Sequence, residues 1–128
     1  MQEALAAIPL DFFRNLRQKN YDKAWKLLST YSQRLFVETL YKSLKPGACS
    51  LERLQTDFES GKGWAESYWS QFTQHLQLDH WLSQNYKEYG VSHQQALVRA
   101  TPSNALLLVI QEEKGWRFGY FETFLDNY

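Results

Sequence analysis

The spacing of the apolar residues changes near Leu82. Before this point they recur every three or four positions, as on one face of a helix, and from Tyr86 to Phe124 they alternate, as in strands. Helices followed by an antiparallel meander predict an α+β domain, in which N-terminal helices pack on a curved C-terminal antiparallel sheet of three to four strands. The chain contains no repeat or linker-like segment, so residues 1–128 are expected to form a single domain.

Five helices are expected in the first part of the chain, each delimited by capping or helix-breaking residues. Pro9 fits the first turn of the first helix, and Asn20, Ser32 and Ser50 are the candidate N-caps of the next three. The segment Gly61–Gly63 separates the fourth helix from the fifth. The apolar stripes place these helices at about residues 5–16, 20–28, 32–44, 50–58 and 65–76.

The second part of the chain is expected to form strands at residues 86–89, 94–101, 105–111 and 116–124. The first is a short edge strand that ends at Gly90. The segment Ala105–Gln111 is apolar on both faces, which is typical of a strand that is covered on both sides. Gly119 removes bulk inside the last strand and predicts a bulge or bend there.

Charge narrows the classes of function without identifying one. The formal net charge is zero, so a general nucleic-acid binder is not expected. Residues 1–50 hold eight lysines and arginines against four acidic residues, and the remainder holds six against ten. A basic first half can serve an anionic partner or membrane surface, or it can reflect solvated faces and attraction between two halves of one fold.

Targeting and redox signals are weak. Cys49 is the only cysteine, so no intramolecular disulfide is possible, and a lone cysteine is usually a small core residue. Met1–Leu10 has an early Glu3 and no basic segment, unlike a signal peptide, and the apolar run Ala105–Ile110 is too short to cross a bilayer. We therefore expect a cytoplasmic protein with no transmembrane segment, no cofactor and no bound metal.

The aromatic residues, 16% of the chain, are the main candidates for ligand binding. They can line a pocket for a small apolar or planar ligand, with tyrosine hydroxyls and indole N–H groups to orient it, or they can fill the core between helices and sheet. Arg99 shares a strand face with Leu97 and can reach into a partly covered region or lie at a sheet edge. The candidate pocket residues are Trp25, Tyr68, Trp69, Phe72, Arg99, Trp116, Phe118 and Tyr120.

Two clusters are candidates for acid–base chemistry. His75 and Asp79, with His80 beside them, would share a face if their helix continued, but His75 can instead be a residue near the helix C-terminus and Asp79 a turn residue. Asp57 and Glu59 can act as a carboxylate pair or can be solvated. Neither cluster matches a known catalytic motif, so no catalytic residue and no metal ligand is assigned.

The order of the expected elements resembles the nuclear transport factor two-like superfamily, which has a cystatin-like α+β cone fold. The segment Phe12–Ser29, FFRNLRQKNYDKAWKLLS, is similar to that family's opening helix, polar turn and second helix, and Ala105–Phe124 is similar to its closing hairpin. The usual member returns to strands soon after the second helix, whereas helical spacing here persists to about Leu82. The family includes isomerases, dehydratases, transport adaptors and domains with no known activity, so the resemblance implies a fold and no single function.

The residues and the resemblance together favour a non-enzymatic binding or protein-interaction module with an aromatic-lined pocket. If both faces of Ala105–Gln111 are buried, a second copy of the chain can cover the face away from the helices and give a homodimer. The alternative is an isomerase- or dehydratase-like enzyme for a small apolar ligand, with Asp57, His75 or Asp79 as the base.

A peripheral adaptor is a third possibility. Its basic first half would meet an anionic surface through exposed cations, and its binding would be sensitive to salt. The candidate contact residues are Arg14, Arg17, Lys19 and Lys23.

Overall fold

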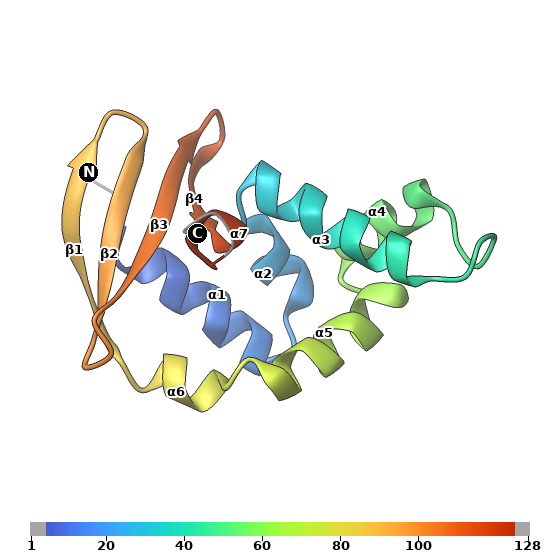
Figure 1. The fold of residues 1–128 in the computed structure, drawn as a ribbon, viewed down its shortest axis with the longest axis horizontal. Helices are drawn as coiled ribbons and strands as arrows, with labels where there is room; N and C mark the ends of the chain where they lie inside the picture. The colour runs from blue at the N-terminus through green and yellow to red at the C-terminus, as the bar shows by residue number, and fades with distance from the viewer. Residues whose placement is uncertain (1–4, 125–128) are drawn as a thin grey trace.

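The computed structural model describes residues 5–124 and confirms an α+β fold, in which N-terminal helices pack on a four-stranded antiparallel sheet (Figure 1). Six helices precede the sheet and one follows it within this range. The helices are α1 (Ala7–Arg17), α2 (Tyr21–Lys26), α3 (Thr30–Ser43), α4 (Leu51–Ser60), α5 (Trp64–His75), α6 (Leu78–Leu82) and α7 (Tyr120–Phe124). The strands are β1 (Asn85–Ser92), β2 (Gln95–Thr101), β3 (Ala105–Glu112) and β4 (Gly115–Gly119), paired in that order.

Most helix boundaries follow the expected caps. The Ser50 hydroxyl accepts a hydrogen bond from the backbone N–H three residues later, and α4 ends at Gly61, whose φ of 73° is left-handed. Asn20 takes the N-cap position of α2, although its side chain makes no capping hydrogen bond. The prediction for α3 is wrong by one turn: Ser29 is the N-cap, its Oγ accepting from the Ser32 N–H at 3.1 Å, and Ser32 lies buried inside the helix.

The first strand is longer than the sequence predicted. It continues through Gly90 because Ser92 pairs with Gln95 across a tight turn. The register shifts between Glu88 and Gly90, so Tyr89 is the extra residue of a β-bulge on the edge strand. The predicted bulge at Gly119 is absent from the described pairing of β3 with β4, because Gly119 is the last residue of β4.

The second half of the predicted last strand is wrong, because residues 120–124 form helix α7. The Phe121 N–H donates to the Ser32 Oγ at 3.0 Å, and the Glu122 carboxylate accepts from the hydroxyls of Ser29 at 2.7 Å and Ser32 at 2.8 Å. We call Ser29, Ser32 and Glu122 the α3–α7 clasp. Ser32 and Glu122 lie 90 positions apart in the chain, so local alternation in the sequence does not reveal this contact.

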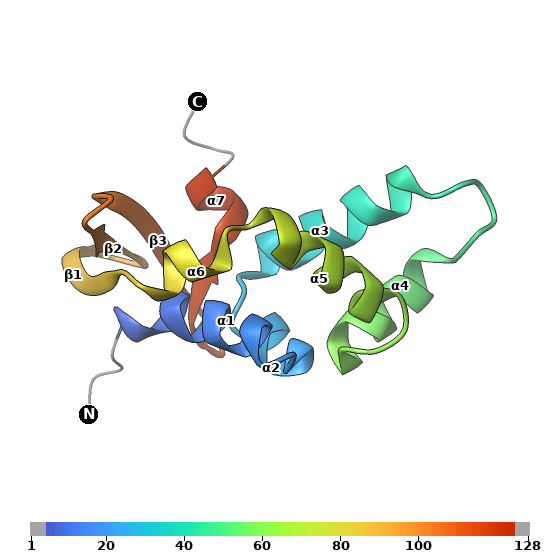
Figure 2. The same ribbon diagram turned by 90° about the horizontal axis from the view of Figure 1, so that it is seen from below.

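An aromatic core fills the space between the helices and the sheet. The rings of Phe36 and Trp69 lie edge to face with their centroids 5.0 Å apart, and Phe12 contacts both Trp69 and Phe118. Helices α1 and α7 contact the sheet directly, whereas α3, α4 and α5 extend away from it (Figure 2). The largest fully buried side chains are Trp69, Phe12, Phe13, Phe36, Phe58 and Phe118.

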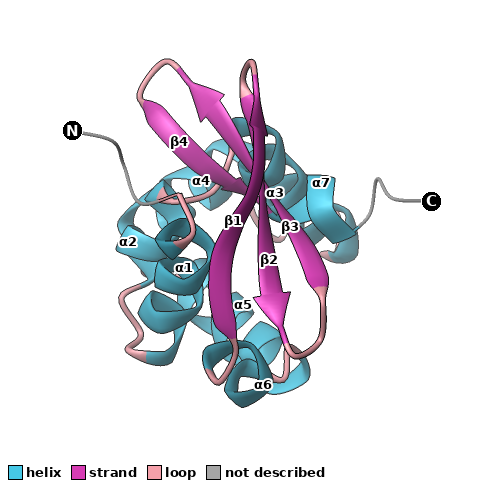
Figure 3. Ribbon diagram, turned by 90° about the vertical axis from the view of Figure 1, so that its left-hand side faces the viewer, coloured by secondary structure: helices cyan, strands magenta, loops and turns pink. Residues whose placement is uncertain are grey.

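The opposite face of the sheet carries apolar side chains as well. Leu97 alternates with buried Ala96 and Val98, and Leu108 alternates with buried Leu107 and Val109, so these leucines point away from the helices. No helix of residues 5–124 lies over this face (Figure 3). The apolar residues on both sides of β3 predicted a strand that is covered on both sides. Among the described residues, no helix covers this second side. We call this surface the helix-free face; it carries Lys87, Leu97, Arg99, Leu106, Leu108 and Ile110.

Candidate aromatic groove

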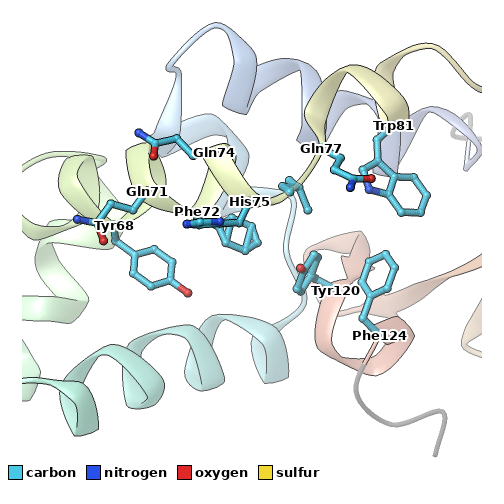
Figure 4. Close-up of a pocket in the computed structure, with 10 residues that line it drawn as sticks. Tyr68, Gln71, Phe72, Gln74, His75, Gln77, Trp81, Tyr120 and Phe124 are labelled. Atoms are coloured by element: carbon cyan, nitrogen blue, oxygen red, sulfur yellow. The ribbon is translucent and has the colours of Figure 1, made fainter.

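An open groove with a volume of about 760 Å³ lies between α5, α6 and α7 (Figure 4). This volume is within the range of small-molecule sites in proteins. The groove is lined by Tyr68, Gln71, Phe72, Gln74, His75, Leu76, Gln77, Trp81, Tyr120 and Phe124.

Helix α5 supplies the longest wall. Tyr68, Phe72 and His75 are spaced by four and three positions, so they project from one side of the helix. The rings of Tyr68 and Phe72 are stacked, with centroids 5.9 Å apart and an interplanar angle of 16°. The helix is fixed at its start, because the buried Asp57 carboxylate accepts the Trp64 N–H at 3.0 Å.

Helix α6 closes one end of the groove. Gln77 has a left-handed backbone with φ of 58°, so the chain turns between α5 and α6. The turn brings the Trp81 ring to the groove, where it stacks on Phe13 of the core with centroids 5.4 Å apart. Trp81 also contacts the Phe124 ring edge to face at 5.6 Å, which joins α6 to α7.

Helix α7 supplies the facing wall through two aromatic residues. Tyr120 and Phe124 lie four positions apart on one side of the helix, with ring centroids 4.8 Å apart. The Tyr120 ring also contacts the Phe72 ring of α5, with the two ring centroids 5.5 Å apart. The α3–α7 clasp holds this helix against α3, so it also positions the groove wall.

The groove is lined by aromatic, aliphatic and amide side chains and by one imidazole, that of His75. Its lining residues include no aspartate, glutamate, lysine or arginine. Burial raises the pKa of Tyr120 to about 12, and burial together with the nearby Tyr120 raises the pKa of Tyr68 above its usual value. Both hydroxyls are therefore neutral at physiological pH, and within residues 5–124 neither is hydrogen-bonded to another protein group. The groove offers aromatic faces, two free hydroxyls and three glutamine amides.

The structure brings three of the predicted pocket residues together, Tyr68, Phe72 and Tyr120, all of which line the groove. Trp25 and Trp69 are buried in the core beneath it, where the rings lie 6.4 Å apart. These two indoles therefore act as packing residues under the groove.

The other three predicted pocket residues lie on the sheet. Phe118 is buried between the sheet and α1, and Trp116 is half-buried on β4 beside the core. Arg99 lies on the helix-free face, with its guanidinium 4.1 Å from the centroid of the Tyr89 ring. None of these three residues lines the groove.

Sequence reasoning missed Trp81 and Phe124 as lining residues. Phe124 falls in the strand predicted at residues 116–124. The four-residue spacing of Tyr120 and Phe124 was the available signal, since it fits a helix as well as a strand. The glutamines Gln71, Gln74 and Gln77 carried no signal of their own.

The three candidate bases are not brought together. His75 lines the groove and is exposed, at the last residue of α5. Asp79 lies beyond the turn into α6, exposed and ion-paired with Arg17, so it does not share a helix face with His75.

The Asp57 carboxylate serves a structural role elsewhere. It is buried, contrary to the expectation of a solvated carboxylate, and its Oδ1 accepts from the Arg53 Nε at 3.1 Å. Glu59, its candidate partner, is exposed. Within the described range, no group of three or more histidine, cysteine or acidic residues is arranged to hold a metal ion.

A scan against protein-family models and searches of curated proteins and of solved structures found no match to this chain. Among the helices of residues 5–124, none has both the length and the apolar character required to span a bilayer.

Proposed function

We propose that the protein is a non-enzymatic binding module that takes an uncharged apolar or planar ligand in the aromatic groove. The observation that carries the proposal is the lining itself, which combines five aromatic rings with no formally charged side chain. A charged ligand would lose hydration there without gaining an ion pair, whereas a neutral ring gains stacking contacts and buries apolar area.

The polar groups of the groove define the ligand further. The hydroxyls of Tyr68 and Tyr120 lie on facing walls, so both can donate to a carbonyl or ether oxygen between them. The glutamine amides line the groove from α5 and the turn after it. The favoured ligand is therefore a flat or compact apolar molecule with one or two oxygen acceptors.

The neutral fluorophore N-phenyl-1-naphthylamine tests this proposal. We expect saturable fluorescence enhancement with the wild-type protein, and native mass spectrometry should show one bound probe that is lost on denaturation. Phe124→Gln should weaken binding by at least about fivefold, because it removes a stacking face from the groove. Tyr41→Gln, at an exposed aromatic position on α3, is the matched control and should bind like the wild type. Equal affinities for both variants, or no saturable binding, would contradict the proposal.

An isomerase- or dehydratase-like activity is the second candidate, and the position of His75 on the groove wall favours it. Such an enzyme would use the imidazole to remove a proton next to a carbonyl group. Incorporation of deuterium into cyclohex-2-enone in D₂O, followed by mass spectrometry, tests this step. Exchange above the buffer rate that is lost in His75→Gln would support the enzyme, and exchange unchanged by His75→Gln would reject it.

Two further proposals concern the fold and its surfaces. Membership of the nuclear transport factor two-like superfamily stays a prediction that rests on the order of helices and meander. A peripheral adaptor would use exposed Arg14, Arg17, Lys19 and Lys23. Arg14 and Arg17 form ion pairs with acidic residues of the chain, which reduces the positive field available to an anionic surface.

A homodimer that forms through the helix-free face is a further possibility for the binding function. Its apolar residues would cover one another across a twofold axis, as the two-faced pattern of β3 suggested. The same axis would bring the cations of the two copies close to each other, which opposes this arrangement.

A further inference from the structure

The strand register shows that the helix-free face is a continuous apolar surface. Residues directly opposite each other on antiparallel strands point to the same side of the sheet. Leu97 of β2 is paired with Leu108 of β3, and Arg99 of β2 is paired with Leu106 of β3. Ile110 extends the apolar row along β3 toward its end. Leu106, on the helix-free face of β3, is 39% exposed. Its neighbour Leu107 points to the helix side and is fully buried.

Cations border this apolar row. Lys87 of β1 is paired with Arg99 of β2, so both lie on the same side of the sheet as the leucines, whereas the Arg117 guanidinium of β4 donates to the backbone carbonyl oxygens of Lys114 and Trp116. The Arg99 guanidinium stacks on Tyr89, and its Nε is buried while no described residue accepts a hydrogen bond from it. A carboxylate is the acceptor that best fits the charge and shape of a guanidinium.

The acidic residues of the sheet do not neutralise these cations. Glu88 is paired with Val98, so it points to the helix side of the sheet. The Glu112 carboxylate accepts from the backbone N–H and the hydroxyl of Thr30, each at 2.9 Å. The helix-free face is therefore both apolar and positively charged within the described residues.

We propose that an acidic amphipathic helix of a partner protein docks on the helix-free face. Its apolar stripe would cover Leu97, Leu106 and Leu108, and its flanking carboxylates would meet Lys87 and Arg99. A helix on an open sheet face completes the layering already present on the other side, where α1 covers the sheet. A second copy of the chain fits less well, because it would place like charges opposite one another.

The sheet sets the length of this helix. The eight residues of β3 span about 26 Å at about 3.3 Å per residue. A helix that covers this distance at about 1.5 Å per residue has roughly 18 residues. Its leucines should recur at positions i, i+3, i+4 and i+7, and its glutamates should flank that stripe.

A synthetic helix of this length, with leucines on one face, glutamates beside them and a terminal rhodamine, is the probe. Fluorescence anisotropy with the full chain should show saturable binding. The double variant Lys87→Glu/Leu106→Gln should raise the dissociation constant at least about tenfold, since it removes a cation and an apolar contact. Lys62→Glu/Leu51→Gln is the matched control, because Leu51 has the same exposed fraction as Leu106 and both residues lie outside the sheet.

Each alternative occupant gives a different result. No saturable binding of the acidic helix, or equal binding of a version with lysines in place of the glutamates, would overturn the proposal. Sedimentation velocity that shows a dimer sensitive to Leu106→Gln would instead assign the face to a second copy. Binding to vesicles of phosphatidylserine and phosphatidylcholine, without binding of the helix, would assign it to a membrane. Binding of N-phenyl-1-naphthylamine in the groove is a separate readout, so either proposal can fail alone.

Discussion

The aromatic groove and the helix-free face are both open apolar surfaces, but they are built in different ways. The groove walls come from the consecutive helices α5 and α6 and from α7, which lies far from both in the chain, and they include no aspartate, glutamate, lysine or arginine. The helix-free face comes from consecutive strands of one meander, and cations border its leucines. Surfaces of similar apolar content would thus suit the two proposed ligands, a neutral one in the groove and an acidic one on the helix-free face.

The two surfaces also depend on different contacts. The groove needs α7 in place, and α7 is held by the α3–α7 clasp and by ring contacts with Phe36. The helix-free face needs only the β-hairpins, whose strands are joined by short turns. Variants that separate these contacts therefore distinguish the two surfaces.

The largest effect is expected from Glu122→Ala, which breaks the clasp and should abolish the groove while sparing the helix-free face. The loss of two hydrogen bonds to a charged acceptor should lower the free energy of unfolding by about 3 kcal/mol. Urea unfolding followed by tryptophan fluorescence measures this loss. Glu113→Ala, in the exposed turn between β3 and β4, should change it by less than about 0.5 kcal/mol. A Glu122→Ala protein with wild-type stability and probe affinity would show that the clasp does not position α7.

Alkaline pH should give the next largest effect, a decrease in the free energy of unfolding that originates at Tyr120 of the groove. The pKa of Tyr120 is about 12 in the folded protein, above its usual value of 10.0, so the unfolded state releases this proton first. The stabilisation is complete below pH 10 and is lost as the pH rises toward 12, by on the order of 2 kcal/mol.

Tyr120→Phe removes that titration. Its free energy of unfolding should depend less on pH between 10 and 12 than that of the wild type, in urea titrations at each pH. Tyr41→Phe, at an exposed position, should keep the wild-type dependence. Parallel curves for all three proteins would mean that Tyr120 does not contribute.

On the helix-free face, Arg99→Leu should separate stability from binding. The change removes a buried donor that has no acceptor among the described residues, so the free energy of unfolding should rise by about 1 kcal/mol. Affinity for the acidic helix should fall at the same time. Arg34→Leu is the control, because the Arg34 guanidinium also lies over a tyrosine ring but at an exposed position of α3. This change should alter the free energy of unfolding by less than about 0.5 kcal/mol. Destabilisation by Arg99→Leu would indicate a structural role for the guanidinium.

Salt should give the smallest difference between the two surfaces. Raising NaCl from about 50 mM to about 500 mM should weaken binding of the acidic helix by roughly threefold, because exposed ion pairs are screened. Binding of the neutral probe in the groove should stay constant or strengthen slightly. Equal salt dependence at both surfaces would mean that ion pairs do not contribute to binding at the helix-free face.

Much of the fold could be predicted from the sequence, because its signals are local. Ser50, Gly61 and the stripe from Tyr68 to Leu76 fixed α4 and α5 to within a few residues, and the turns fixed β2 and β3. The conversion of residues 120–124 into a helix could not be predicted, because it depends on hydroxyls of α3 that only the folded chain brings near.

Only part of the candidate site could be predicted, because only some of its contacts are local in the sequence. Tyr68 and Phe72 share a helix face, and this local pattern identified them as partners. Which side of the aromatic stripe faces a groove and which faces the core depends on α7 and α6. Trp69, one position from Tyr68, was therefore grouped with the pocket although it is fully buried.

The bulge at Tyr89 has a consequence for how copies of this protein behave in concentrated solution. β1 is one of the two outer strands of the sheet, and its eight residues would otherwise present a regular row of backbone donors and acceptors to another chain. The extra residue interrupts that row at its middle, and the adjacent Lys87 and Glu88 add charge to it. An incoming strand cannot keep its register across this point, so the edge resists templated growth into cross-β aggregates.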